Sequence, residues 1–208
     1  GSASDPACPS CYYAPTEYSE DIRTTEKTRS AYLQYRTTFD WSMPLHVAVG
    51  ARYEQTEVES NALVRVPTGI SWSSANEFNI DYAADRGFVA GKGKYDYVLP
   101  NLDLKLDLSE SLALRGSYSR TLGRPSWTQI QSGQSLADIV RTQGGSGSRG
   151  NPGLEPLISD NFDLSLEWYY GEASYASVGF FRKNIKNFIS DTIVRENAGT
   201  LHTPVGGA

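Results

Sequence analysis

The chain has 208 residues, a formal net charge of −5 and a composition rich in aromatic side chains, with Tyr 13, Phe 7 and Trp 4 against Met 1 and Cys 2. This length allows one or two domains, and the aromatic content favours β-strands over helices. No run of Lys or Arg follows one face, which argues against a nucleic-acid partner, and the absence of an apolar run of about 18 residues excludes a helical membrane span.

Residues 1–27 are predicted to form an outer loop that holds the only two cysteines, Cys8 and Cys11. Their CxxC spacing is found in redox motifs, in half-sites for metals and in small loop disulfides. A redox motif needs a βα context and a zinc site needs two more ligands nearby, and neither is visible. We therefore expect a disulfide formed in an oxidising compartment and no metal site.

The next two segments are predicted strands joined by a short turn at Met43 and Pro44. Residues 28–41 alternate apolar with polar side chains, and residues 45–54 continue the alternation. A period of two residues is typical of a strand with one apolar and one polar face. Residues 60–92, which follow, are expected to be a long polar outer loop.

The clearest strand pair is predicted at residues 98–108 and 112–119, around a short turn at Ser109 and Glu110. Leu102, Leu104 and Leu106 alternate with polar residues in the first of these strands. A second long outer loop is expected at 124–157, with a short helix at residues 135–141.

Two further strands are predicted around the short turn of Gly171, Glu172 and Ala173. The strand of residues 161–168 alternates cleanly, whereas residues 175–193 carry adjacent Phe180 and Phe181, so the faces of that strand stay unassigned. A partial barrel is thus expected over 28–195, and residues 196–208 are expected to be a truncated outer loop. The two ends predict that the chain is an internal piece of a longer protein.

The layout of these elements predicts an outer-membrane β-barrel. Short turns fall on one rim of an up-and-down sheet and long loops on the other, and strands of about 10 residues match a tilted crossing. Aromatic residues gather near both strand ends, as membrane interfaces select: Phe39, Trp41, Trp168 and Tyr170 at one rim, Tyr53 and Tyr118 at the other. The alternative is a secreted, soluble β-sandwich that binds a ligand such as a carbohydrate, with the aromatic residues in its core.

The residues carry no enzyme constellation. His46 and His202 are far apart in sequence, and acidic pairs such as Asp103 and Asp107 fit the polar face of a strand. Stacking and ion pairing with an external ligand would suit five residues of the two long loops, although solvated loop residues are the simpler interpretation: Trp72, Arg86, Trp127, Arg141 and Arg149.

Several sequence phrases resemble the barrel of TonB-dependent outer-membrane receptors. They lie at residues 97–108, 114–125, 150–156 and 163–169, and a fifth at 181–189 resembles the strand that follows in that family. The pairing of the strand end Ser119–Pro125 with the loop exit Gly150–Pro156 is the most specific part. Pro125 ends a strand because it cannot donate a hydrogen bond, and Asn151, Pro152 and Gly153 are turn formers.

The resemblance implies an all-β, antiparallel up-and-down meander of about six long strands, part of a transmembrane β-barrel of about 22 strands. It also implies active import of a scarce nutrient (siderophore-iron, a vitamin or an oligosaccharide) across the outer membrane of a Gram-negative bacterium. The implied partners are outer-membrane lipid, the nutrient, and a TonB-type energy-transducing protein that is engaged through an N-terminal part and plug not seen in this sequence. No cofactor and no enzymatic activity are expected.

Overall fold

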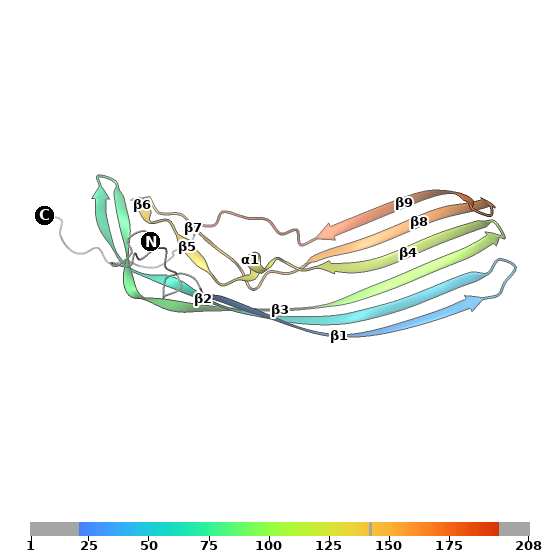
Figure 1. Ribbon diagram of the computed structural model, residues 1–208, viewed down its shortest axis with the longest axis horizontal. Helices are drawn as coiled ribbons and strands as arrows, with labels where there is room; N and C mark the ends of the chain where they lie inside the picture. Colours follow the sequence, from blue (N-terminus) through green and yellow to red (C-terminus); the bar gives the residue numbers. More distant parts are fainter. Residues whose placement is uncertain (1–20, 142, 196–208) are drawn as a thin grey trace, which may run out of the picture.

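The computed structural model describes residues 21–141 and 143–195. Its main feature is one antiparallel sheet in the order β1-β2-β3-β4-β8-β9, in which each long strand pairs with its neighbours in sequence (Figure 1). The predicted all-β up-and-down meander of six long strands is confirmed. These strands are β1 (Ile22–Phe39), β2 (Leu45–Ser74), β3 (Glu77–Ser109), β4 (Leu112–Gly123), β8 (Leu157–Gly171) and β9 (Ser174–Lys186).

The segment between β4 and β8, residues 124–156, holds the minor elements and is called the β4–β8 segment below. It contains α1 (Trp127–Ile130), β5 (Gln134–Leu136), β6 (Ile139–Arg141) and β7 (Gly147–Arg149). The helix expected at residues 135–141 is wrong, because the β-branched pair Ile139 and Val140 instead adds a short strand beside β3. In the part of the chain that the structure describes, no helix is long and apolar enough to cross a membrane.

The two faces of the sheet differ in polarity because the pairing keeps one register over long distances. Val47 lies opposite Leu104, and Leu164 lies opposite both Gly116 and Phe180, so apolar residues share one face across neighbouring strands. Leu104 is 37% and Leu164 41% exposed, and no second layer covers them among the described residues. A sandwich would have enclosed these side chains, so the apolar face is an outer wall rather than a core.

Residues 60–92 continue β2 and β3 as a paired hairpin, where a long polar outer loop was expected. β2 and β3 stay paired from Leu45 opposite Leu106 out to Ser74 opposite Glu77, with Ala75 and Asn76 as the turn. β1 likewise begins at Ile22, within the stretch expected to be loop, and β9 ends at Lys186, well before residue 195. Polar residues are stable in these strands because the hairpin continues ladders that the apolar band has already aligned.

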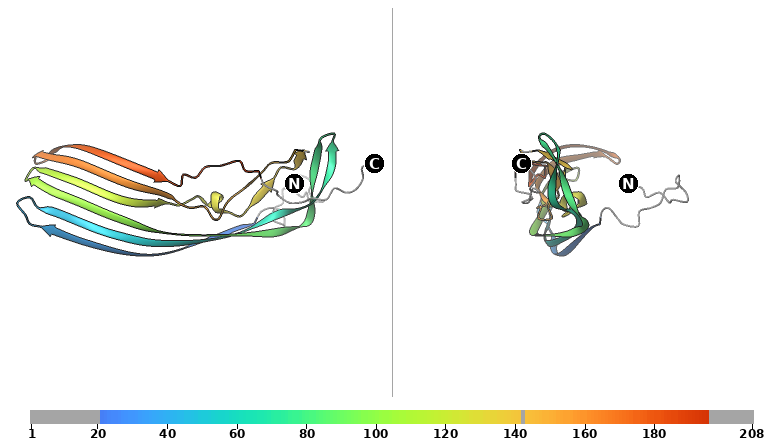
Figure 2. Two further views of the ribbon diagram at one scale, coloured as in Figure 1. Left: turned by 180° about the vertical axis from the view of Figure 1, so that it is seen from behind. Right: turned by 90° about the vertical axis from the view of Figure 1, so that its left-hand side faces the viewer.

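The sheet is long and curved (Figures 1 and 2), and apart from Ala113 beside an inner turn its buried apolar side chains lie in the outer parts of the strands. Val58, Ala62 and Val64 of β2 are buried, together with Ile130 of α1. The β2 positions have the same parity as His46 and Arg52, so they belong to the polar face. The small core of this chain therefore forms where the β4–β8 segment covers that face.

Candidate functional site

The polar face forms a shallow trough near the inner turns of the sheet. Its ion pairs join neighbouring strands: Arg115 Nε lies 2.9 Å from Glu167 Oε2, and Lys105 Nζ lies 2.8 Å from Asp107 Oδ1. A wall with these paired charges suits a water-filled lumen. The polar side chains that line the trough are Arg36, Thr38, His46, Asp103, Lys105, Arg115, Ser117, Asp163 and Ser165.

Farther out, the β4–β8 segment is fixed to the same face by two hydrogen bonds that Ser132 donates to Ser60. The backbone N–H of Ser132 donates to Oγ of Ser60 over 2.9 Å, and Oγ of Ser132 donates to the carbonyl oxygen of Ser60 over 2.8 Å. Both residues are buried. Because buried polar groups are costly when unpaired, this pair holds the segment in one position.

Two glycines of β3 allow the segment to approach the sheet closely. A Cβ atom added at Gly91 would lie 2.7 Å from Cγ of Pro152, and one at Gly93 would overlap the carbonyl group of Pro152. Pro152 stands in the turn predicted from residues 151–153, where the N–H of Gly153 donates to Oδ1 of Asn151 over 2.9 Å. Residues larger than glycine would force the turn away from the sheet.

Arg124 ties the start of the segment to two strands. Its Nη2 donates to Oε1 of Glu54, a carboxylate that is 6% exposed, and its Nε lies 3.0 Å from Oε1 of Glu26 without forming a hydrogen bond. Arg52 Nη2 lies 2.8 Å from the other oxygen of Glu54. Burial by itself would raise the pKa of Glu54, but the hydrogen bonds from Arg52 and Arg124 outweigh it and hold this pKa below its ordinary value.

The end of the segment is tied to β3 and to the exit of β9. Nδ2 of Asn187 donates to Oε2 of Glu155 over 3.1 Å and to the carbonyl oxygen of Pro156 over 3.3 Å. Burial and the nearby Glu155 carboxylate raise the pKa of Tyr97, whose hydroxyl donates to Glu155 over 3.3 Å. Asn187 has a φ of 56°, a left-handed conformation that asparagine tolerates well.

The outermost part of the β2–β3 hairpin bends sharply (Figure 1). The register shifts between Arg65 and Pro67 and again between Pro67 and Gly69, and such irregularities bend a strand. Beyond the bend, the rings of Trp72 and Phe78 lie 4.3 Å apart. The hairpin tip thus presents an aromatic pair in which Trp72 is exposed and Phe78 is half-buried.

The five predicted ligand-binding residues do not lie at one point of the structure. Arg141 reaches the tip, where its Nη2 lies 3.0 Å from Glu77 Oε1, and residues 74–77 with 141 and 143 line a small hollow. Trp72 is near this tip, Arg86 is farther down β3, and Arg149 is in β7, paired with β5. Trp127 is 60% exposed in α1. Ligand contact by these residues stays a prediction.

Sequence reasoning missed the residues that position the segment. Ser60, Gly91, Gly93 and Glu54 carry no motif, and only the resulting register brings them under residues 124–156. The capping box of α1, in which Ser126 and Gln129 satisfy each other's backbone groups, was a usable signal for the helix start. The predicted disulfide between Cys8 and Cys11 lies outside the described residues.

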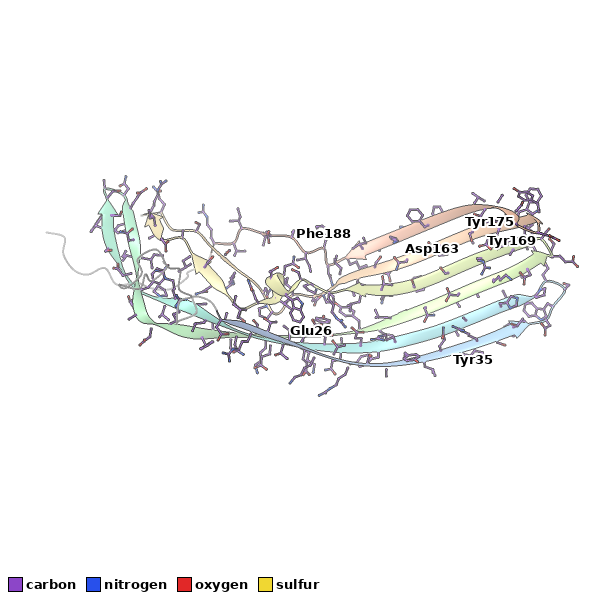
Figure 3. The ribbon with its side chains drawn as sticks, in the orientation of Figure 1. Glu26, Tyr35, Asp163, Tyr169, Tyr175 and Phe188 are labelled. Atoms are coloured by element: carbon purple, nitrogen blue, oxygen red, sulfur yellow. The ribbon has the colours of Figure 1, made fainter. Side chains whose placement is uncertain are left out.

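In the described ranges, no group of three or more His, Cys, Asp and Glu side chains is placed to hold a metal ion. Figure 3 labels Glu26 and Tyr35 of β1, whose positions differ in parity, so they lie on the polar and the apolar face respectively.

No curated protein sequence is significantly similar to the chain. Two similar solved structures are of the ferric enterobactin receptor PfeA, one in complex with BCV-L6 (14% identity, TM-score 0.40) and one of a mutant from Pseudomonas aeruginosa in complex with enterobactin (16% identity, TM-score 0.36). Each alignment covers 78% of this chain but 27% of the receptor chain, so the chain spans about a quarter of their length.

The family is shown by the sequence profile described as TonB dependent receptor-like, beta-barrel, which matches residues 3–206. This match covers nearly the whole chain, and the polar-inside, apolar-outside meander agrees with it. The chain therefore belongs to the TonB-dependent receptor-like β-barrel family.

Proposed function

We propose that this chain forms part of the wall and outer mouth of a receptor in the outer membrane of a Gram-negative bacterium, which imports a scarce nutrient with energy from a TonB-type partner. The nutrient is siderophore-bound iron, a vitamin or an oligosaccharide. Family membership supports the receptor role. The unsheltered apolar face, with Leu104 and Leu164 open, supports a place in lipid.

The observation that carries the proposal is the way the β4–β8 segment folds back over the polar face. Ser132 and Arg124 anchor the segment to Ser60 and Glu54 of β2. The segment therefore covers the outer part of the polar face. Exposed aromatic side chains, Trp127 in α1 and Trp72 near the hairpin tip, are then available to an external ligand. Aromatic rings bind flat or apolar ligand groups by stacking, and nearby arginines attract anionic ones.

The experiment is a binding titration of the intact receptor with one ferric siderophore, one vitamin and one oligosaccharide. The variant Trp127→Ala with Trp72→Ala should weaken binding of the true ligand class about tenfold, the loss expected for one or two stacking contacts. Trp168→Phe, at the inner end of β8, is the matched control and should bind as the unsubstituted receptor does.

Growth on the same compounds under limitation gives the second measurement. Cells that lack the receptor should fail to grow on the bound compound and should regain growth with the intact gene. If none of the three classes binds and none depends on the receptor for growth, the import proposal is wrong. If Trp127→Ala with Trp72→Ala and the control Trp168→Phe lose the same binding affinity, the ligand does not contact Trp72 and Trp127.

A further inference from the structure

The outermost part of the β2–β3 hairpin lies beyond a break in the ladder. Pairing is regular up to Arg65 opposite Arg86 and resumes at Gly69 opposite Asp81, where Figure 1 shows the sharp bend. We call residues 69–81 the arm and the paired strands before Arg65 and Arg86 the base. Between the arm and the base, two residues of β2 and three of β3 have no partner in the described ladder: Val66, Thr68, Ala83, Ala84 and Asp85.

The break has the properties of a hinge. Pro67, the one β2 residue that is paired within it, cannot donate a ladder hydrogen bond. Ala83 and Ala84 are small and lie opposite no residue of β2. A hinge needs a few residues that can change φ and ψ at the end of an element. Rotation at this bend would therefore leave the ladders of the arm and of the base intact.

The arm is held in its bent position by β6. This strand pairs with residues 77–79, at the edge of the arm. Next to it, the N–H of Ile80 donates to the carbonyl oxygen of Asp138 over 3.0 Å. Nη2 of Arg141 lies 3.0 Å from Oε1 of Glu77. All of these contacts join the arm to the β4–β8 segment rather than to the base.

The same segment is tied to the base, below the bend. Ser132 donates two hydrogen bonds to Ser60 of β2. Nη1 of Arg65, the last paired β2 residue of the base, lies 3.2 Å from Oδ1 of Asp138. Only residues 133–138 separate Ser132 from β6, so the connection is short. The β4–β8 segment thus links the arm to the base across the bend.

The link at the arm consists of contacts that water can replace. β6 has three residues, and the side chains of Asp138 and Arg141 are 77% and 68% exposed. Exposed ion pairs contribute little to stability because water screens them. A ladder of three residues at a sheet edge belongs to the parts of a protein that open locally at low cost. The anchor at Ser60 and Ser132 is buried, so β6 is the weaker end of the link.

We propose that the arm is hinged at the bend and exchanges between a bent state, in which β6 is paired to it, and a released state, in which β6 has left its edge. Release separates Phe78 from Val140, its partner across the ladder. Trp72 moves with the arm, so the distance between Trp72 and Trp127 changes between the two states. That consequence for the outer mouth rests on the proposed import function, whereas the hinge itself does not.

The test measures the distance between the arm and the base in the intact receptor. Nitroxides are attached to p-acetylphenylalanine, which replaces Ala75 in the turn of the arm and Thr25 of β1, opposite Glu59 in the base. Pulsed electron paramagnetic resonance should give a main short distance from the bent state and a minor long one. Val140→Pro disrupts β6 and should raise the ratio of long to short distances about tenfold. Ser148→Pro disrupts only the β5–β7 pairing and should change this ratio less than about twofold.

A reversible lock gives a second measurement. Glu77→Cys with Arg141→Cys places two thiols at opposite positions of the β3–β6 ladder, within reach of a disulfide. The oxidised form should give the short distance alone, and reduction should bring the long distance back. Asn61→Cys with Ala90→Cys, opposite each other in the base, is the control disulfide and should keep both distances.

The hinge is wrong if Val140→Pro leaves the distances unchanged, if Ser148→Pro changes them equally, or if the oxidised lock keeps the long distance. Gel mobility before and after boiling shows whether each variant is folded. If Val140→Pro does not fold, the two disulfides decide. Uptake of the nutrient is measured separately on the unsubstituted receptor. Its absence removes the import proposal and leaves the hinge standing, whereas normal uptake with unresponsive distances removes the hinge alone.

Discussion

At the residue scale, the position of the β4–β8 segment depends on a few small or buried side chains that the sequence does not mark with any motif. Gly91 and Gly93 give Pro152 room to approach β3, Ser60 pairs with Ser132, and Glu54 receives Arg124. Each contact links the β4–β8 segment to a strand more than thirty residues away in sequence. The position of the segment therefore depends on the small size or the hydrogen bonds of these individual residues on the polar face.

The first prediction concerns Gly93→Ala. The added Cβ would overlap the Pro152 carbonyl group, so we expect the 151–153 turn to move outward at a cost of about 1–3 kcal/mol. Limited proteolysis of the intact receptor should then cut within residues 143–156 several times faster. Gly116→Ala, whose new Cβ would have Leu164 Cδ1 3.8 Å away, is the control and should be cut as slowly as the unsubstituted protein.

The second prediction concerns acid. Since the pKa of Glu54 in the folded protein lies below its ordinary value of 4.5, its pairing stabilises the segment at higher pH, and this contribution is lost as the pH falls through the lowered pKa. Hydrogen exchange of residues 126–141, corrected for intrinsic rates, should therefore rise below about pH 4. Glu54→Gln should show faster exchange already at pH 7 and a flatter pH profile. An identical acid response in Glu54→Gln and the unsubstituted receptor would rule out this carboxylate.

At the element scale, alternation of apolar and polar residues identified the long strands and their faces. It worked because each face meets one environment over many residues, so Leu102, Leu104 and Leu106 had to share a side. Alternation was less useful at residues 22–27 and 60–92, where both faces are polar or mixed. These parts of the strands continue the backbone pairing that begins in the apolar part of β1, β2 and β3. The same limit applies to β9, whose adjacent Phe180 and Phe181 are assigned to opposite faces only by their partners Leu164 and Asp163.

The third prediction compares two neighbours on β8. Leu164→Lys places a charge on the apolar outer face and should reduce the free energy of unfolding of the intact receptor in lipid vesicles by about 2–4 kcal/mol. Ser165→Lys adds the same charge to the polar trough and should cost less than about 1 kcal/mol. Urea unfolding followed by gel mobility measures both. Equal costs would mean that β8 does not separate lipid from water.

At the scale of the whole molecule, the sheet is a curved wall whose two sides differ in chemistry and whose outer end is partly covered from within. Aromatic pairs mark its inner rim, with the rings of Phe39 and Trp41 5.3 Å apart and those of Trp168 and Tyr170 5.1 Å apart. Near this rim, Tyr169 and Tyr175 flank the last short turn (Figure 3). This organisation predicts where solvent and lipid probes reach the protein.

The fourth prediction uses that difference. In versions of the intact receptor that keep one tryptophan of this chain, quenchers confined to lipid tails should quench Trp168 strongly, and water-soluble acrylamide should quench it weakly. Trp127, exposed in α1 outside the apolar band, should show the reverse. If Trp168 is inaccessible from lipid, the assignment of the apolar face to the membrane is wrong.

The sequence by itself determined the fold class, the order of the six strands, the short inner turns and the membership of the family. These properties are written in local periods and phrases that do not depend on distant residues. The tertiary structure alone decided that residues 60–92 continue as a paired hairpin, that residues 124–156 fold back over the polar face, and that Arg120 and Lys186 meet at Asp160. Each of these depends on which residues lie opposite one another across strands, and that register is set by the pairing of the whole sheet rather than by any one segment.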